Sequence, residues 1–127
     1  MRWLALAARV LVGLGFLVFG LNYFAKVIPI PPAPTASAGA YLGLLAGSGY
    51  LTVVKVLEVV GGALVLSGRY TPAGLVLVTP VAVNVALYEV CLIGGPGPGV
   101  VLTVLCGLLV AYYWRHFAGA FAPAAVV

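Results

Sequence analysis

Four long apolar runs, separated by short segments rich in glycine and proline, constrain the fold of this chain more than any other feature. Hydrophobic residues make up 65% of the 127 residues, whereas soluble domains are about 45–50% apolar. A helix needs about 20 apolar residues to cross the hydrocarbon core of a bilayer. We therefore predict a single transmembrane domain over residues 1–127, an all-α, membrane-embedded four-helix bundle. The spans are expected at about residues 4–24, 50–66, 73–93 and 100–114.

The segment between the first two predicted spans divides into a loop and a short helix. Its first part reads KVIPIPPAPTAS, where the prolines exclude a helix because each removes a donor and clashes with the preceding turn. Its second part, ASAGAYLGLLAGSG over residues 36–49, is apolar but too short to cross a bilayer by itself. We expect a short extra helix here, lying at the membrane interface or packed against the bundle.

The basic residues are distributed unevenly about the predicted spans. With four spans, Arg2, Arg9, Arg69 and Arg115 fall on one side of the membrane, whereas Lys26 alone borders a span on the other side. Lysine and arginine are enriched in cytoplasmic segments next to spans. We therefore expect both termini in the cytoplasm. The Pro-rich loop, the short helix and the GGPGPG turn before the fourth span would then face outward.

Several classes of function do not fit the composition. The formal net charge is +4, but the basic residues form no cluster, so we expect no nucleic-acid partner. Cys91, Cys106 and the single histidine, His116, lack the spacing of a metal site. The sequence has no haem, flavin or iron–sulfur signature and no nucleophile paired with a base. We therefore expect no metal, no intrinsic cofactor and no catalysis by this chain alone.

Most strongly polar residues inside the predicted spans lie in the outer half of the membrane. At about 1.5 Å per residue from Tyr50, Lys55 lies roughly 7 Å and Glu58 roughly 12 Å below the outer end of the second span. The two share a helix face, because residues three or four apart do so. Depth and periodicity together give these candidate ligand-binding residues: Lys55, Glu58, Asn84, Tyr88, Asn22 and Lys26.

The pair formed by Lys55 and Glu58 has two interpretations. Charged residues inside a membrane are costly and normally face the bundle interior in pairs. In the first interpretation, the pair is a neutral tie that holds the helices together, with Asn84 as an interhelical hydrogen-bond partner. In the second, the pair and its neighbours line a small-molecule pocket that opens outward. The sequence favours neither over the other.

Other residues in the spans have simpler expected roles. Glu89 lies about 140° around its helix from Asn84, counting about 100° per residue, so we expect it to meet a different helix or the outer headgroups. Cys91 and Cys106 should stay unpaired, because their depths differ by roughly 6 Å or more. The Gly61–Gly62 pair is expected to let the second span approach a neighbour closely.

Several of these segments also resemble those of a known family. They are FLVFGLNYF, PIPPAP, the run from SGYLTVVKVLEVVGG to NVALYEV, and YYWRHFAGAF. The most specific parts are KVLEVVGG at residues 55–62, GRYTP at residues 68–72, and PVAVN ending at Asn84. Over nearly its whole length the chain resembles the DoxX family of small four-helix membrane proteins. Many members of that family have a histidine five residues after the asparagine, where this chain has Glu89.

The resemblance implies a four-helix membrane fold and a link to redox proteins. Relatives in that family include the membrane subunit of thiosulfate:quinone oxidoreductase and proteins associated with membrane oxidoreductase complexes. On this basis we expect a protein of a bacterial or archaeal cell membrane that binds quinone or another lipophilic molecule beside an oxidoreductase partner. The alternative is a structural accessory subunit that packs against a larger membrane complex and has no ligand of its own.

Overall fold

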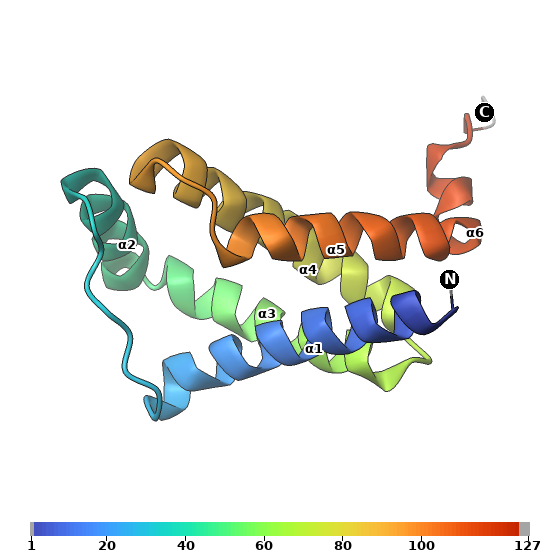
Figure 1. Ribbon diagram of the computed structural model, residues 1–127, viewed down its shortest axis with the longest axis horizontal. Coiled ribbons are helices and arrows are strands. Elements are labelled where there is room, and N and C mark those ends of the chain that lie inside the picture. The colour runs from blue at the N-terminus through green and yellow to red at the C-terminus, as the bar shows by residue number, and fades with distance from the viewer. Residues whose placement is uncertain (1, 125–127) are drawn as a thin grey trace.

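The computed structural model describes residues 2–124, which form an elongated bundle of helices (Figure 1). The elements are α1 (Arg2–Ala25), α2 (Ala36–Ser48), α3 (Tyr50–Ser67), α4 (Thr71–Leu87), the π-helical segment η1 (Tyr88–Ile93), α5 (Pro98–Tyr112), α6 (Trp114–Phe117) and the 3₁₀ turn η2 (Ala118–Phe121). Over residues 2–124 there is no β-strand. The predicted all-α class is therefore confirmed.

Three helical segments are long and apolar enough to cross a membrane, namely Arg2–Ala25, Tyr50–Ser67 and Thr71–Ile93, the last of which joins α4 to η1. Their ends lie within about two residues of the first three predicted spans. A fourth span is counted only if α5 is taken together with the segment that follows, which bends away from it by 83°. The predicted fourth span, residues 100–114, agrees with α5 to within two residues, but the bend after α5 was not predicted, because the letters YYW contain no residue that breaks a helix.

The four long helices α1, α3, α4 and α5 enclose one shared core. Its buried side chains include Val12, Phe16, Val65, Leu75, Val78, Cys106 and Leu109. The outward faces of the same helices are also apolar, with Leu11, Val76 and Val101 each about 60% exposed. Soluble monomers rarely expose apolar patches of large contiguous area, so an outer surface of this kind suits contact with lipid chains.

Glycines let the helices approach one another closely. A Cβ added at Gly62 in α3 would lie 2.9 Å from the carbonyl oxygen of Gly13 in α1. A Cβ added at Gly74 in α4 would lie 2.7 Å from the carbonyl oxygen of Gly61 in α3. Small residues permit this kind of backbone contact between membrane helices. The close approach predicted for the Gly61–Gly62 pair is therefore confirmed.

The short helix α2 packs against α3 and η1, in agreement with one of the two positions predicted for it. Its first turn is capped by Thr35, whose hydroxyl accepts a hydrogen bond of 3.1 Å from the backbone N–H of Ala38. The same hydroxyl donates a 2.7 Å hydrogen bond to the carbonyl oxygen of Leu92 in η1. At its other end, Gly49 adopts a left-handed conformation with φ of 83° and leads directly into α3.

The two ends of the bundle differ in what they carry (Figure 1). At one end lie α2, the Pro-rich loop before it and the turn between η1 and α5; we call this the α2 end. At the other lie the start of α1, the turn between α3 and α4, and the segment α6–η2; we call this the terminal end. Polar residues of different kinds gather at the two ends, so each is described separately.

Candidate functional site

The two charged residues of α3 contact each other as their spacing predicts. The Nζ atom of Lys55 lies 3.2 Å from Oε2 of Glu58 and donates a 3.4 Å hydrogen bond to Oε1. Glu58 is buried, at 5% exposure, whereas the Lys55 side chain is 21% exposed. An ammonium group has three N–H donors. Lys55 therefore has donor capacity beyond the carboxylate of Glu58, and it keeps an accessible side.

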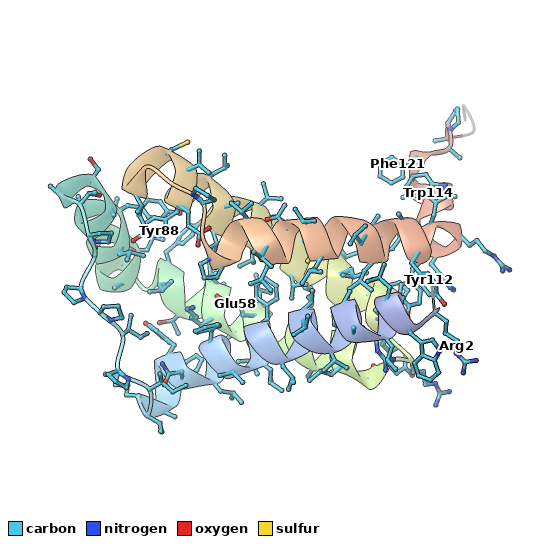
Figure 2. All side chains as sticks on the ribbon, in the orientation of Figure 1. Arg2, Glu58, Tyr88, Tyr112, Trp114 and Phe121 are labelled. Carbon is cyan, nitrogen blue, oxygen red and sulfur yellow. The ribbon has the colours of Figure 1, made fainter. Side chains whose placement is uncertain are left out.

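That accessible side faces a cavity of about 270 Å³. The cavity lies between α2, α3 and α4, and its polar lining comes from Lys55, Glu58, Asn84, Tyr41, Tyr50 and Tyr88. Leucine and valine side chains of the same helices form the remaining walls: Leu42, Leu45, Leu51, Val54, Val81 and Val85. Figure 2 labels Glu58 in the bundle and Tyr88 nearer the α2 end. The site therefore combines one ion pair with aromatic and aliphatic walls, as small-molecule sites commonly do.

A second cavity of about 200 Å³ adjoins the first along η1. It shares Tyr41, Asn84 and Tyr88 with the first cavity and is otherwise lined by Leu87, Cys91 and Leu92. The rings of Tyr41 and Tyr88 are tilted by 32°, with 5.6 Å between their centroids. Asn84 is exposed on α4 and lines both cavities. The two cavities therefore meet at Tyr41, Asn84 and Tyr88, and each has both polar and aliphatic lining residues.

Four of the six predicted site residues therefore line one cavity, and two do not. Asn22 and Lys26 line neither of the two cavities. The Oδ1 atom of Asn22 accepts hydrogen bonds of 3.1 Å from the N–H of Val27 and 2.7 Å from that of Ile28, and Nδ2 donates 3.0 Å to the Ile28 carbonyl. Lys26 has φ of 54° where the chain leaves α1. Asn22 thus closes the turn that ends α1, and its amide is already engaged there.

Glu89 lies outside the cavity and contacts a different helix, as its helical angle predicts. Its Oε2 atom accepts a 2.9 Å hydrogen bond from the N–H of Gly99, and Oε1 accepts one of 3.2 Å from the N–H of Val100. Both donors belong to the first turn of α5, which follows Gly97. A helix N-terminus has unpaired N–H groups and a positive end of its dipole, so a carboxylate stabilises it.

The cysteines are free and lie in different surroundings, which confirms that they do not form a disulfide. Cys91 is exposed beside the second cavity, whereas Cys106 is buried in the core. Among the described residues, no group of three or more His, Cys, Asp or Glu side chains is placed to hold a metal ion.

Sequence reasoning missed the contribution of α2 to the cavity. Tyr41, Leu42 and Leu45 lie on one face of this helix, because Leu45 follows Tyr41 by four residues and Leu42 by three. That spacing is visible in the letters YLGLL, but it does not reveal which helix the face will meet. The place of Tyr50 in the cavity lining was missed for a related reason. Tyr50 is the first residue of α3, so the direction of its side chain depends on the fold of the preceding turn at Gly49.

The chemistry available at this site is recognition of a polar group beside an apolar body. Lys55 supplies a cation, Glu58 a carboxylate and Asn84 an amide that both donates and accepts hydrogen bonds. No protein-family model, curated protein or solved structure matches this chain. The likeness to the DoxX family seen in the sequence therefore stays a prediction.

Proposed function

We propose that this chain is a DoxX-like integral membrane protein that binds quinone, or another lipophilic molecule with a polar head, beside a membrane oxidoreductase. The observation that carries the proposal is the 270 Å³ cavity, where the pair of Lys55 and Glu58 lies among aromatic and aliphatic walls. An ion pair at membrane depth is a functional-site hypothesis by default, because burying charges there is costly.

The head of the ligand would lie against the pair and the amide. A carbonyl oxygen of a quinone accepts hydrogen bonds, and Lys55 Nζ and Asn84 Nδ2 are donors that line the same cavity. The rings of Tyr41, Tyr50 and Tyr88 offer flat apolar surface to a flat ring. The second cavity, with Leu87 and Leu92, extends the site along η1 and would receive the start of an apolar tail.

Electrons would come from a partner protein. The chain carries no sequence signature of a haem, flavin or iron–sulfur centre, so it would hold the ligand while an oxidoreductase exchanges electrons with it. On this proposal the chain is a binding subunit and is not an enzyme by itself.

In the bilayer, α1, α3 and the joined segment α4–η1 would span the membrane, and α5 together with the bent segment that follows it would make the fourth crossing. Both termini would lie in the cytoplasm and the cavity would open toward the outer surface. Single cysteines introduced at Ala36 and Gly97, in a background without Cys91 and Cys106, should react with an impermeant reagent added outside. A cysteine at Ala124 should not. The opposite labelling pattern would reverse the orientation.

The ligand proposal is tested by purifying the protein in a mild detergent and extracting what it retains. Chromatography of the extract with detection of quinones should find a lipophile bound in a fixed ratio to the wild-type protein. The variant K55M/E58M should fold and lose that lipophile. The matched control K26M removes a lysine that lines neither cavity and should retain it. Equal lipophile content in K55M/E58M and wild type would refute the role of the pair.

The alternative, an accessory subunit without a ligand, is favoured by one observation. Lys55 and Glu58 come from the same helix and satisfy each other, so the pair is complete without a further molecule. In that case a larger membrane complex would copurify with the chain, the extract would contain no bound lipophile, and K55M/E58M would assemble as the wild type does.

A further inference from the structure

Three arginines at the terminal end each stand next to an exposed aromatic residue. In α1, the Cζ atom of Arg2 lies 5.9 Å from the centre of the Trp3 ring. In the turn between α3 and α4, the Cζ atom of Arg69 lies 5.7 Å from the centre of the Tyr70 ring. In α6, Arg115 follows Trp114. All three arginines are exposed, and so are the three aromatic residues, with Trp3 at 76%. The arginine contacts the neighbouring ring in the first two cases, and in the third the two residues are neighbours in the sequence.

These arginines have no carboxylate partner among the described residues. The chain has only two acidic side chains, Glu58 and Glu89. Glu58 contacts Lys55, and Glu89 caps the first turn of α5, near the α2 end. Arg9 adds a further positive charge near the terminal end, since its guanidinium group lies against Gly68 at the end of α3. The described residues of the terminal end therefore form a cationic surface that contains no carboxylate side chain to neutralise it.

The shape of the terminal end fits the plane of a membrane surface. The segment after α5 turns away from it by 83°, so α6 and η2 run across the bundle axis (Figure 1). Within this segment the rings of Trp114 and Phe121 stack, with centroids 5.3 Å apart. Figure 2 shows Arg2, Tyr112, Trp114 and Phe121 gathered at this end. Exposed tryptophan and tyrosine rings typically lie at the level of lipid headgroups.

We infer that the terminal end binds anionic phospholipid headgroups, with Arg2, Arg69 and Arg115 contacting their phosphates. A guanidinium group presents paired N–H donors that match the geometry of a phosphate. The adjacent aromatic rings occupy the interface just below the phosphates. Anionic lipids are preferred over zwitterionic ones because the arginines lack carboxylate partners among the described residues. This inference rests on the membrane placement in the proposed function and is independent of the ligand in the cavity.

The chain provides its own probe for this surface. Trp3 and Trp114 are its only tryptophans, and both lie at the terminal end. The wild-type protein is reconstituted in phosphatidylcholine bilayers that contain increasing fractions of brominated phosphatidylglycerol or brominated phosphatidylcholine. Bromine quenches tryptophan fluorescence on contact. We expect brominated phosphatidylglycerol to quench more strongly at equal mole fraction, with a preference of about fivefold per engaged arginine. Raising the salt concentration should reduce the preference, because these charges are exposed.

Variants identify the source of the preference. The triple variant R2Q/R69Q/R115Q should quench equally with the two lipids, whereas the control K26Q, which changes a lysine at the α2 end, should keep the wild-type preference. Circular dichroism establishes that each variant is folded. If the triple variant does not fold, the salt series on the wild-type protein decides the question.

The inference would be overturned by equal quenching by the two lipids in the wild-type protein at low salt, or by a preference that persists in the folded triple variant. A preference unaffected by salt would contradict it as well. Failure of either brominated lipid to quench would instead show that the membrane placement is wrong. The test therefore separates this inference from the proposed function.

Discussion

The only two acidic side chains of this protein, Glu58 and Glu89, are both buried but serve different partners. Both oxygens of Glu89 accept hydrogen bonds from the main chain of α5, and the residue lines neither cavity. Both oxygens of Glu58 lie close to a single flexible side chain, Lys55, beside a cavity. A carboxylate held by backbone donors has a fixed environment, whereas one held by a lysine can change its partner when a molecule enters.

The difference separates a charge that the fold needs, on Glu89, from a pair of charges that could bind another molecule, on Lys55 and Glu58. Gly99 at the start of α5 would have an unpaired N–H group without Glu89, whereas the N–H of Val100 also donates a 3.1 Å hydrogen bond to the Gly97 carbonyl. In a low-dielectric setting an unpaired N–H costs several kcal/mol. Glu89 therefore completes the fold. Lys55 and Glu58 form their ion pair only with each other, so replacing both should change the free energy of unfolding little.

The largest expected effect comes from removing one member of the pair. K55M leaves Glu58 buried without its cation, and breaking a buried pair in this way costs about 3–5 kcal/mol. E58Q should cost less, because Lys55 is partly exposed and can reach water in the cavity. The double variant K55M/E58M should recover most of the loss, since apolar replacement of both partners is often neutral. Thermal unfolding in detergent, followed by circular dichroism, measures all three.

If the double variant is as unstable as K55M, the contrast between the two acids is wrong. Lys55 and Glu58 would then make stabilising interactions with the rest of the bundle as well as with each other. V53M is the matched control, since it introduces a methionine on an exposed position of the same helix and should leave stability unchanged.

A smaller effect is expected at the second carboxylate. E89Q keeps one oxygen acceptor for the N–H of Gly99, but it turns an NH₂ group toward the N–H of Val100, which retains only its hydrogen bond to the Gly97 carbonyl. The expected loss is about 1–3 kcal/mol in the same unfolding measurement. V90A changes a neighbouring exposed side chain and should have little effect.

E89Q also sharpens the contrast between the two acids. It should retain the lipophile of the cavity while losing stability, whereas K55M/E58M should show the reverse. Loss of the lipophile in a folded E89Q protein would mean that the two acids are not independent.

The smallest effect on stability is expected at Asn84, which is exposed and lines both cavities. N84A should change the free energy of unfolding by no more than about 0.5 kcal/mol, as surface substitutions usually do. Affinity for the lipophile should fall up to about tenfold, the equivalent of one lost hydrogen bond. Titration of the delipidated protein with a short-chain quinone measures it, and unchanged affinity would remove Asn84 from the site.

Much of the fold was predictable because helix ends follow local chemistry. Glycine and proline stop α2 and α3 where the sequence indicates, and the spacing of Lys55 and Glu58 requires that they meet. The bend at Tyr113 was not predictable, since nothing in its local sequence disfavours a helix. The bend depends on the path of the chain after α5, which its local sequence does not determine.

The site was predictable only where the contacting residues lie on one helix, as Lys55 and Glu58 do. Asn22 was assigned to the site from its depth, but its amide folds the following loop back onto α1 through Val27 and Ile28. Tyr41 reaches the cavity because α2 is held against η1. The hydroxyl of Thr35, which caps α2, donates a hydrogen bond to the carbonyl of Leu92, 57 positions away. Sequence periodicity describes one helix at a time, so contacts of this range lie beyond it.

The two acids also have a consequence for how the chain enters a membrane. The four arginines belong to the terminal end, whereas the two lysines and the two glutamates belong to the half of the bundle toward the α2 end. There the lysines and glutamates cancel, so the formal charge of +4 is carried by the terminal end alone. In the proposed orientation the half that must be translocated is electrically neutral, and the half that stays behind holds every excess charge. In that orientation the chain would resist inversion during biosynthesis, because the excess positive charge stays on the cytoplasmic side.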